Sequence, residues 1–123
     1  MSKNDLIRSS VTHRDGTAVL AISGEVDLAS AAVFERAIAD VLAEDPPSLI
    51  IDLAGVPFLA SAGVGILMQA RSRFSDADRF SVVTQDPLTI RVIQILGVDG
   101  LLSLRSTVGD ALSAVEPRCC SAE

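Results

Sequence analysis

Residues 48–67, SLIIDLAGVPFLASAGVGIL, decide how this chain folds. The apolar, β-branched run over residues 48–53 predicts a buried strand, and Val64 and Leu67 recur at the spacing of one helix face. Between them a short loop leads to Ser61, where we expect the helix to begin. A strand, a tight loop and a helix in this order predict one unit of a layered α/β fold.

Ser61 is a candidate site because of its place on this predicted helix. We expect it to be the N-cap, whose side-chain oxygen accepts a hydrogen bond from an unpaired backbone N–H of the first turn. The positive end of the helix dipole favours a negative charge there, so the position would tolerate a phosphate. Serine is also among the commonest N-caps, and most such serines only cap a helix. The position by itself leaves both roles open.

Strands and helices alternate through the rest of the chain. Residues Leu6 to Val11 and Thr17 to Ser23 predict a hairpin, because Asp15-Gly16 between them is a strong turn signal. The further expected elements are, in order, a helix from Ser30 to Ala43, the strand Ser48 to Leu53, a helix from Ser61 to about Phe74, a strand from Arg79 to Thr84, a helix from Asp86-Pro87 to Gly97, a short strand near Leu101 to Leu104, and a last helix that begins at Thr107. Thr107 and Asp110 have the spacing of a capping box for this last helix. Its buried stripe is expected to consist of Val108, Ala111, Leu112 and Val115.

This order predicts an α/β fold with a mostly parallel sheet, since strands that alternate with helices are joined by right-handed crossovers. Asp52 and Ser81 interrupt strands that are otherwise apolar. A parallel sheet covered on both faces has nearly continuous apolar strands. We therefore expect the helices to cover one face more heavily than the other, and Asp52 to be a solvated or hydrogen-bonded structural residue.

Length and composition favour one domain. A chain of 123 residues with 49% hydrophobic residues suits a single core, which we expect from about residue 6 to 115, with a tail over 116–123. No apolar run approaches the ~20 residues that cross a bilayer, and the N-terminus lacks a signal peptide, so we expect a soluble, cytoplasmic protein. Cys119 and Cys120 lie in the tail, where we expect free thiols and no metal site.

Charge and residue usage exclude several functions. Ten basic and sixteen acidic residues give a net charge of −6, and the basic residues are spread singly, which argues against nucleic-acid binding. Lys3 is the only lysine, so Gly63 and Gly65 are not part of a phosphate-binding P-loop. His13, the only histidine, falls in the predicted hairpin turn and is not placed to form a triad with a serine. We therefore expect no catalytic residue and no cofactor.

Three segments together resemble the sulfate transporter and anti-sigma-factor antagonist (STAS) domain. They are Gly24-Glu25-Val26-Asp27-Leu28, Ile51-Asp52-Leu53 and Phe58-Leu59-Ala60-Ser61-Ala62-Gly63-Val64. The resemblance runs from about Leu6 to Val115, and within the family the chain is similar to the small, single-domain bacterial antagonists. It implies a mixed sheet with an antiparallel first hairpin followed by parallel strands, and about four helices mainly on one face.

The resemblance also implies a function in transcription regulation. Such an antagonist binds an anti-sigma factor, which is itself a serine kinase, and thereby releases the sigma factor. The kinase would phosphorylate Ser61 and so end the binding, and a separate phosphatase would restore it. The resemblance implies neither a nucleic-acid nor a membrane partner, and we expect a monomer or weak dimer. The alternative is a non-phosphorylated STAS scaffold, or a small-ligand module in a larger regulatory or transport assembly.

The partner-binding residues that we expect on this basis lie in two loops: Glu25, Asp27, Ala60, Ser61, Ala62 and Gly63. Glu25 and Asp27 could meet a basic partner, although Asp27 could instead cap the first helix. Gly63 and Gly65 would let a partner approach closely, or would let their helix pack tightly on the sheet. Ala60 departs from the family pattern, which commonly has aspartate there, and Ala62 stands where Ser or Thr is frequent. These departures leave the efficiency of phosphorylation and the identity of the partner open.

Overall fold

The computed structural model describes residues 7–113 apart from Asp15, Leu28, Phe58 and residues 77–78. The strands are β1 (Ile7–Arg14), β2 (Thr17–Gly24), β3 (Ser48–Gly55), β4 (Phe80–Val83) and β5 (Leu104–Arg105). The helices are α1 (Ala31–Leu42), α2 (Ser61–Arg71), α3 (Pro87–Ile95), α4 (Asp99–Leu102) and a last helix over residues 108–113. Expectations for Leu6, Val115 and the tail with Cys119 and Cys120 lie outside the described residues.

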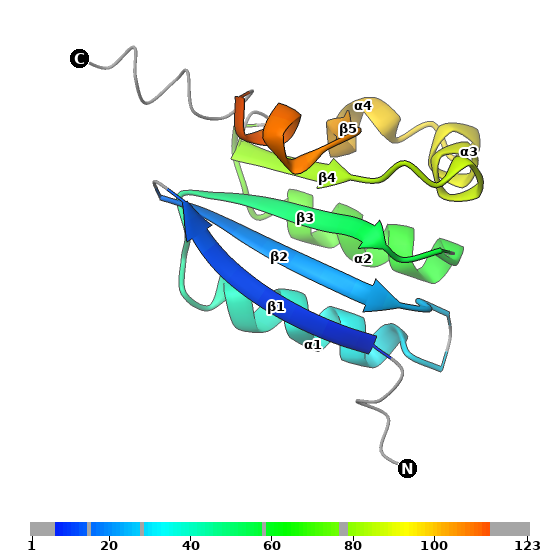
Figure 1. The fold of residues 1–123 in the computed structure, drawn as a ribbon, viewed down its shortest axis with the longest axis horizontal. Helices are drawn as coiled ribbons and strands as arrows, with labels where there is room; N and C mark the ends of the chain where they lie inside the picture. The colour runs from blue at the N-terminus through cyan, green and yellow to red at the C-terminus, as the bar shows by residue number, and fades with distance from the viewer. Residues whose placement is uncertain (1–6, 15, 28, 58, 77–78, 114–123) are drawn as a thin grey trace.

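The strands form one sheet in the order β1-β2-β3-β4-β5 (Figure 1). β1 pairs with β2 antiparallel, and the three remaining pairings are parallel. The hairpin closes with Arg14 opposite Thr17, so β1 is longer than expected. Gly16 has φ of +87°, a conformation that glycine adopts at little cost. The predicted mixed sheet with an antiparallel first hairpin is confirmed.

The two faces of the sheet are covered unequally. Alternate residues of β3 point to opposite faces, so Leu49 and Ile51 lie in the main core while Ile50 lies in a smaller one. The main core includes side chains from α1 to α4. The smaller core receives Ala111 and Leu112 from the last helix, which lies on the other side of the sheet from α1 and α2 (Figure 1). The expectation of one heavily covered face is thereby confirmed.

The segment between α3 and β5 differs from the expectation of a strand near Leu101 to Leu104. Most of it forms the short helix α4, whose Leu102 is fully buried in the main core. Ser103 then adopts the left-handed conformation with φ of +51°, which turns the chain so that Leu104 pairs with Val82. A short run of leucines fits a buried strand or a buried helix equally well, so its periodicity could not decide between them.

Helix α3 begins as its sequence predicts. The Asp86 carboxylate accepts hydrogen bonds from the backbone N–H of Thr89 at 3.0 Å and from its hydroxyl at 2.8 Å, and Pro87 occupies the first turn. Gly97, with φ of +73°, follows the end of the helix. The buried residues of α3 are Thr89 and Ile93. The apolar side chains that stand out in its sequence, Leu88 and Ile95, are therefore largely on its outer surface.

The last helix is capped by Thr107, as expected. The hydroxyl of Thr107 accepts a hydrogen bond from the backbone N–H of Asp110 at 3.0 Å, and its carbonyl accepts one from Ala111 at 3.1 Å. Ala111 and Leu112 are buried, which confirms that part of the predicted stripe. Across the described ranges, no helix combines the length and the apolar character needed to span a membrane.

Candidate functional site

Two loops meet at the edge of the sheet where β2 and β3 end. Because these strands run parallel, the loops that follow them leave at the same edge. Val26 of the first loop and Leu59 of the second form a parallel bridge, and the backbone N–H of Ala60 donates to the carbonyl oxygen of Val26 at 2.8 Å. The Glu25–Asp27 loop and the loop before Ser61 therefore lie next to each other.

The base of this site is apolar and tightly packed. Val26 and Leu59 are both 0% exposed, and the first turn of α2 lies against them. A Cβ atom at Gly63 would lie 2.6 Å from Cδ1 of Leu59 and 3.0 Å from Cγ1 of Val26. At Gly65 a Cβ would meet nothing within 4 Å. Gly63 therefore serves the packing of α2 on the two loops, whereas Gly65 leaves open space on the outer surface.

Ser61 is not the N-cap, so that expectation was wrong. The N-cap of α2 is Ala60, in extended conformation with φ of −72° and ψ of 162°. Its carbonyl oxygen accepts the first helical hydrogen bonds, from Gly63 at 2.8 Å and Val64 at 3.3 Å. Ala60, whose N–H is bonded to Val26, is the residue before the helix, so α2 begins at Ser61 as expected and ends at Arg71, before the expected Phe74. Ser61 is the first helical residue, and its exposed hydroxyl bonds to no residue that the structure describes.

Asp27 shapes the loop before α1. Its Oδ1 atom accepts hydrogen bonds from the backbone N–H groups of Ala29 at 3.0 Å and Ser30 at 3.1 Å, and from the Ser30 hydroxyl at 3.2 Å. Ser30 is fully buried, and its single hydroxyl hydrogen is shared between Asp27 and the carbonyl oxygen of Glu25, which is the closer acceptor at 2.6 Å. Asp27 thus caps the turn that leads into α1, while Ser30 holds the N-cap position itself. The sequence left two roles open for Asp27, contact with a partner and capping of the first helix. The hydrogen bonds of its carboxylate support the capping role.

Glu25 differs from Asp27 in how its carboxylate is used. The backbone of Glu25 is held by Ser30, but its side chain is exposed and bonds to no described residue. It belongs to the loop that the Val26–Leu59 bridge ties to the start of α2. The site therefore offers one unengaged carboxylate and one unengaged hydroxyl on neighbouring loops.

Other candidate residues lie apart from this site. Asp52 is half-buried, and its Oδ1 accepts a hydrogen bond from the backbone N–H of Ala54 at 3.0 Å, which supports a structural role. His13 lies beside the hairpin turn, at the opposite edge of the sheet, and bonds to Glu44 at 3.2 Å. No histidine is therefore available to activate Ser61. The described part of the chain contains no group of three or more His, Cys, Asp or Glu side chains that could hold a metal ion.

Sequence reasoning missed a set of exposed apolar side chains on and after α3 and on α4. They are Leu88, Ile95, Leu96 and Leu101, with exposed fractions of 60, 73, 49 and 48%. Since β4 runs parallel to β3, α3 starts from the same sheet edge as α2 (Figure 1). The signal was present in the sequence: Leu88 and Ile95 are on one face of α3 and Thr89 and Ile93 on another, so the helix has more apolar surface than one core contact can cover.

Comparisons with known proteins identify the family and the fold. The model of the STAS domain matches residues 8–111. The anti-sigma-F factor antagonist RsfB of Mycobacterium tuberculosis is 42% identical over 115 residues, which cover 94% of each chain. The crystal structure of an anti-sigma factor antagonist from Mycobacterium paratuberculosis has 40% identity and a TM-score of 0.85, covering 94% of this chain and 99% of that one. The anti-sigma factor antagonist SpoIIAA in its unphosphorylated form shares the fold, with 16% identity and a TM-score of 0.68 over 92% of this chain and 97% of its own.

Proposed function

This chain belongs to the STAS domain family, and from that membership we propose that it acts as an anti-sigma factor antagonist. It binds an anti-sigma factor in the cytoplasm and thereby frees the sigma factor that this partner holds. The extent of the match supports the proposal, since 94% of this chain aligns with 94% of the antagonist RsfB. The protein then acts by binding, with no catalytic residue of its own.

The observation that carries the proposal is the exposed hydroxyl of Ser61 at the start of α2. A hydroxyl that caps a helix is held by its own backbone, but this one has no partner among the described residues. The half-buried Ala62 and the exposed Gly65 add little bulk around it. A kinase can therefore reach Ser61 without first unfolding the helix.

Phosphorylation of Ser61 would switch off partner binding without changing the fold. A phosphate adds about 1.5 to 2 negative charges, and removing its bound water on binding is costly in free energy. It therefore disrupts an interface in which the serine is neutral. The start of α2 tolerates that charge, because the first backbone N–H groups of a helix point outward with a partial positive charge. No native hydrogen bond of the Ser61 side chain is lost in the reaction.

We assign different roles to the two acidic residues of the neighbouring loop. Asp27 positions the loop through three hydrogen bonds to Oδ1. Glu25 is exposed on the loop that the Val26–Leu59 bridge ties to the segment before Ser61, and it meets a basic group of the partner, which supplies charge that Ala60 lacks. We expect the kinase to supply the base for phosphoryl transfer, and the structure is consistent with this because no described residue accepts a hydrogen bond from Ser61.

The apolar side chains Leu88 and Ile95 extend the proposed partner surface along α3. Large exposed apolar side chains that gather on one element are typical of protein–protein contact sites. Both lie on the helix that starts at the same sheet edge as α2. A protein partner would cover them, whereas a small ligand at Ser61 would not.

Incubation of the protein with the anti-sigma kinases of its organism and Mg-ATP tests this function. We expect one kinase to bind and to transfer one phosphate, which mass spectrometry maps to Ser61. Ser61→Ala should abolish the transfer, and Ser72→Ala, an exposed serine at the other end of α2, should not. Stable binding without transfer would instead favour the non-phosphorylated scaffold, and phosphate on another residue would remove Ser61 from the switch.

A further inference from the structure

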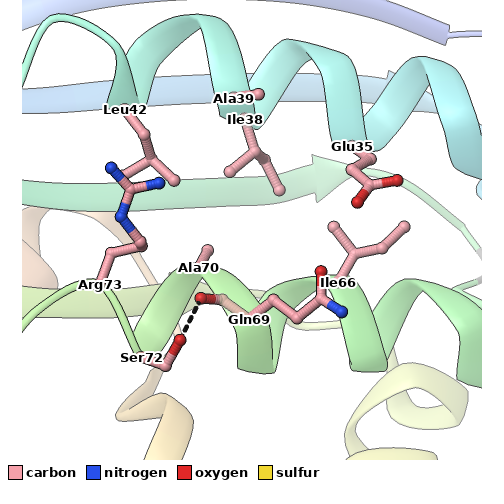
Figure 2. A pocket seen from close by; sticks show the side chains of 9 residues that line it. All are labelled: Glu35, Ile38, Ala39, Leu42, Ile66, Gln69, Ala70, Ser72 and Arg73. Atoms are coloured by element: carbon pink, nitrogen blue, oxygen red, sulfur yellow. Dashed lines mark hydrogen bonds between the residues drawn. The ribbon is translucent and has the colours of Figure 1, made fainter.

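Helices α1 and α2 leave a pocket between them (Figure 2), and Ser61 is not part of its lining. Its volume is about 330 Å³, within the ~300–1,000 Å³ range of small-molecule sites. The lining comes from α1, from α2 and from the turn that follows α2. All of these residues belong to the described part of the chain.

The floor of the pocket is aliphatic. Ile38 and Ala70, which are 3% and 2% exposed, lie at its base, and the half-buried Leu42 and Ile66 flank them. This surface offers no hydrogen-bonding side chain, so it favours an apolar group over water. The occupant must therefore have an apolar body.

The two ends of the pocket carry opposite charges. Figure 2 shows Arg73 beside Leu42 at one end and Glu35 above Ile66 at the other. Glu35 and Leu42 are seven positions apart on α1, which corresponds to ~10 Å of helix. Neither charged side chain forms an ion pair with a described residue, in contrast to Arg36, which pairs with Asp40 at 3.6 Å.

We propose that this pocket binds a small amphipathic anion, an aliphatic chain that ends in a carboxylate. The chain lies over Ile38 and Ile66, and the carboxylate binds the guanidinium of Arg73, which has free donors for it. Glu35 repels an anion at the opposite end and so sets the orientation of the ligand. This binding is separate from the proposed partner contact, although α2 takes part in both.

Octanoate is a suitable probe, because its extended chain of ~10 Å is comparable to the length of helix between Glu35 and Leu42. In a titration of the nitrogen-15-labelled protein, we expect saturable shifts of the backbone amide signals around Ile38, Ile66 and Ala70. Octanol, which has the same chain but no charge, should bind about fivefold more weakly. Equal binding of octanoate and octanol, no saturable shift, or shifts centred on Leu88 and Ile95 would each overturn the proposal.

Matched variants locate the site. Arg73→Gln should weaken octanoate binding about fivefold, and Arg36→Gln, at an exposed arginine outside the pocket, should leave it unchanged. Ala39→Leu fills the rim and should reduce binding, whereas Ala32→Leu, at an exposed alanine of the same helix that does not line the pocket, should not. Alanine and leucine are both strong helix formers, so both variants are expected to fold. An equal effect within either pair would place the ligand elsewhere.

Discussion

The backbone N–H of Ala60 donates to the carbonyl oxygen of Val26 at 2.8 Å, and this bond joins the loop after β2 to the start of α2. With this bond in place, Ala60 is the N-cap of α2, and the hydroxyl of Ser61 forms no capping hydrogen bond. It also keeps the exposed Glu25 on a loop next to that hydroxyl. The proposed switch is built on this one contact between residues far apart in the sequence.

Replacement of Ser61 separates a structural role from a functional one. Because the side chain caps nothing, Ser61→Ala should change the free energy of unfolding by less than about 0.5 kcal/mol in urea titrations. Partner binding should be retained in Ser61→Ala, while Ser61→Glu should weaken it roughly tenfold or more by placing a charge in the interface. A loss of ~1 kcal/mol or more in Ser61→Ala would mean that the hydroxyl caps the helix after all.

The two glycines of α2 form a matched pair. Gly63→Ala should destabilise the protein by about 1–3 kcal/mol, since the new methyl group would lie 2.6 Å from the Leu59 side chain. Gly65→Ala should be neutral or stabilise by up to ~1 kcal/mol, because it has open space and removes a flexible residue from the helix. Thermal or urea unfolding of both variants measures the difference. Similar values for the two would contradict the packing role of Gly63.

Asp27 and Glu25, in the loop after β2, should also differ in what their replacement affects: stability for Asp27 and partner binding for Glu25. Asp27→Ala removes the acceptor of three hydrogen bonds and should cost about 1–2 kcal/mol of folding free energy. Glu25→Gln should leave the unfolding midpoint unchanged but weaken partner binding and flatten its dependence on salt, because an exposed charge acts mainly across the interface. If Glu25→Gln binds the partner with unchanged affinity at low salt, its carboxylate is not part of the contact.

Exposed apolar side chains of α3 provide a test of how far the partner surface extends. The double variant Leu88→Ser and Ile95→Ser should fold with nearly wild-type stability, since both side chains are mostly in solvent. We expect the binding affinity for the anti-sigma factor to fall severalfold, as measured by calorimetry. Ile93→Ser in the buried face of the same helix is the contrasting case and should destabilise the fold instead. Unchanged affinity in the double variant would confine the interface to the two loops.

Local patterns predicted much of the fold and part of the site. The turn signal at Asp15-Gly16 predicted the hairpin, and the Asp86-Pro87 pair predicted the start of α3, because turns and caps depend on residues that are close in sequence. Because β2 and β3 run parallel, the loops that follow them lie at the same edge of the sheet. The short strand expected near Leu101 to Leu104 begins only at Leu104, because Leu101 and Leu102 belong to α4, and a short apolar run does not by itself distinguish a helix from a strand.

The sequence by itself determined the order of the elements as far as α3, the mixed sheet and the presence of a serine where β3 leads into α2. Only the tertiary structure decided that Ala60 and not Ser61 caps the helix, that Gly63 packs while Gly65 is free, and that Asp27 is engaged while Glu25 is exposed. The physical reason is the same in each case. A side chain's role depends on which donors and atoms from other parts of the chain reach it, and residue spacing does not contain that information.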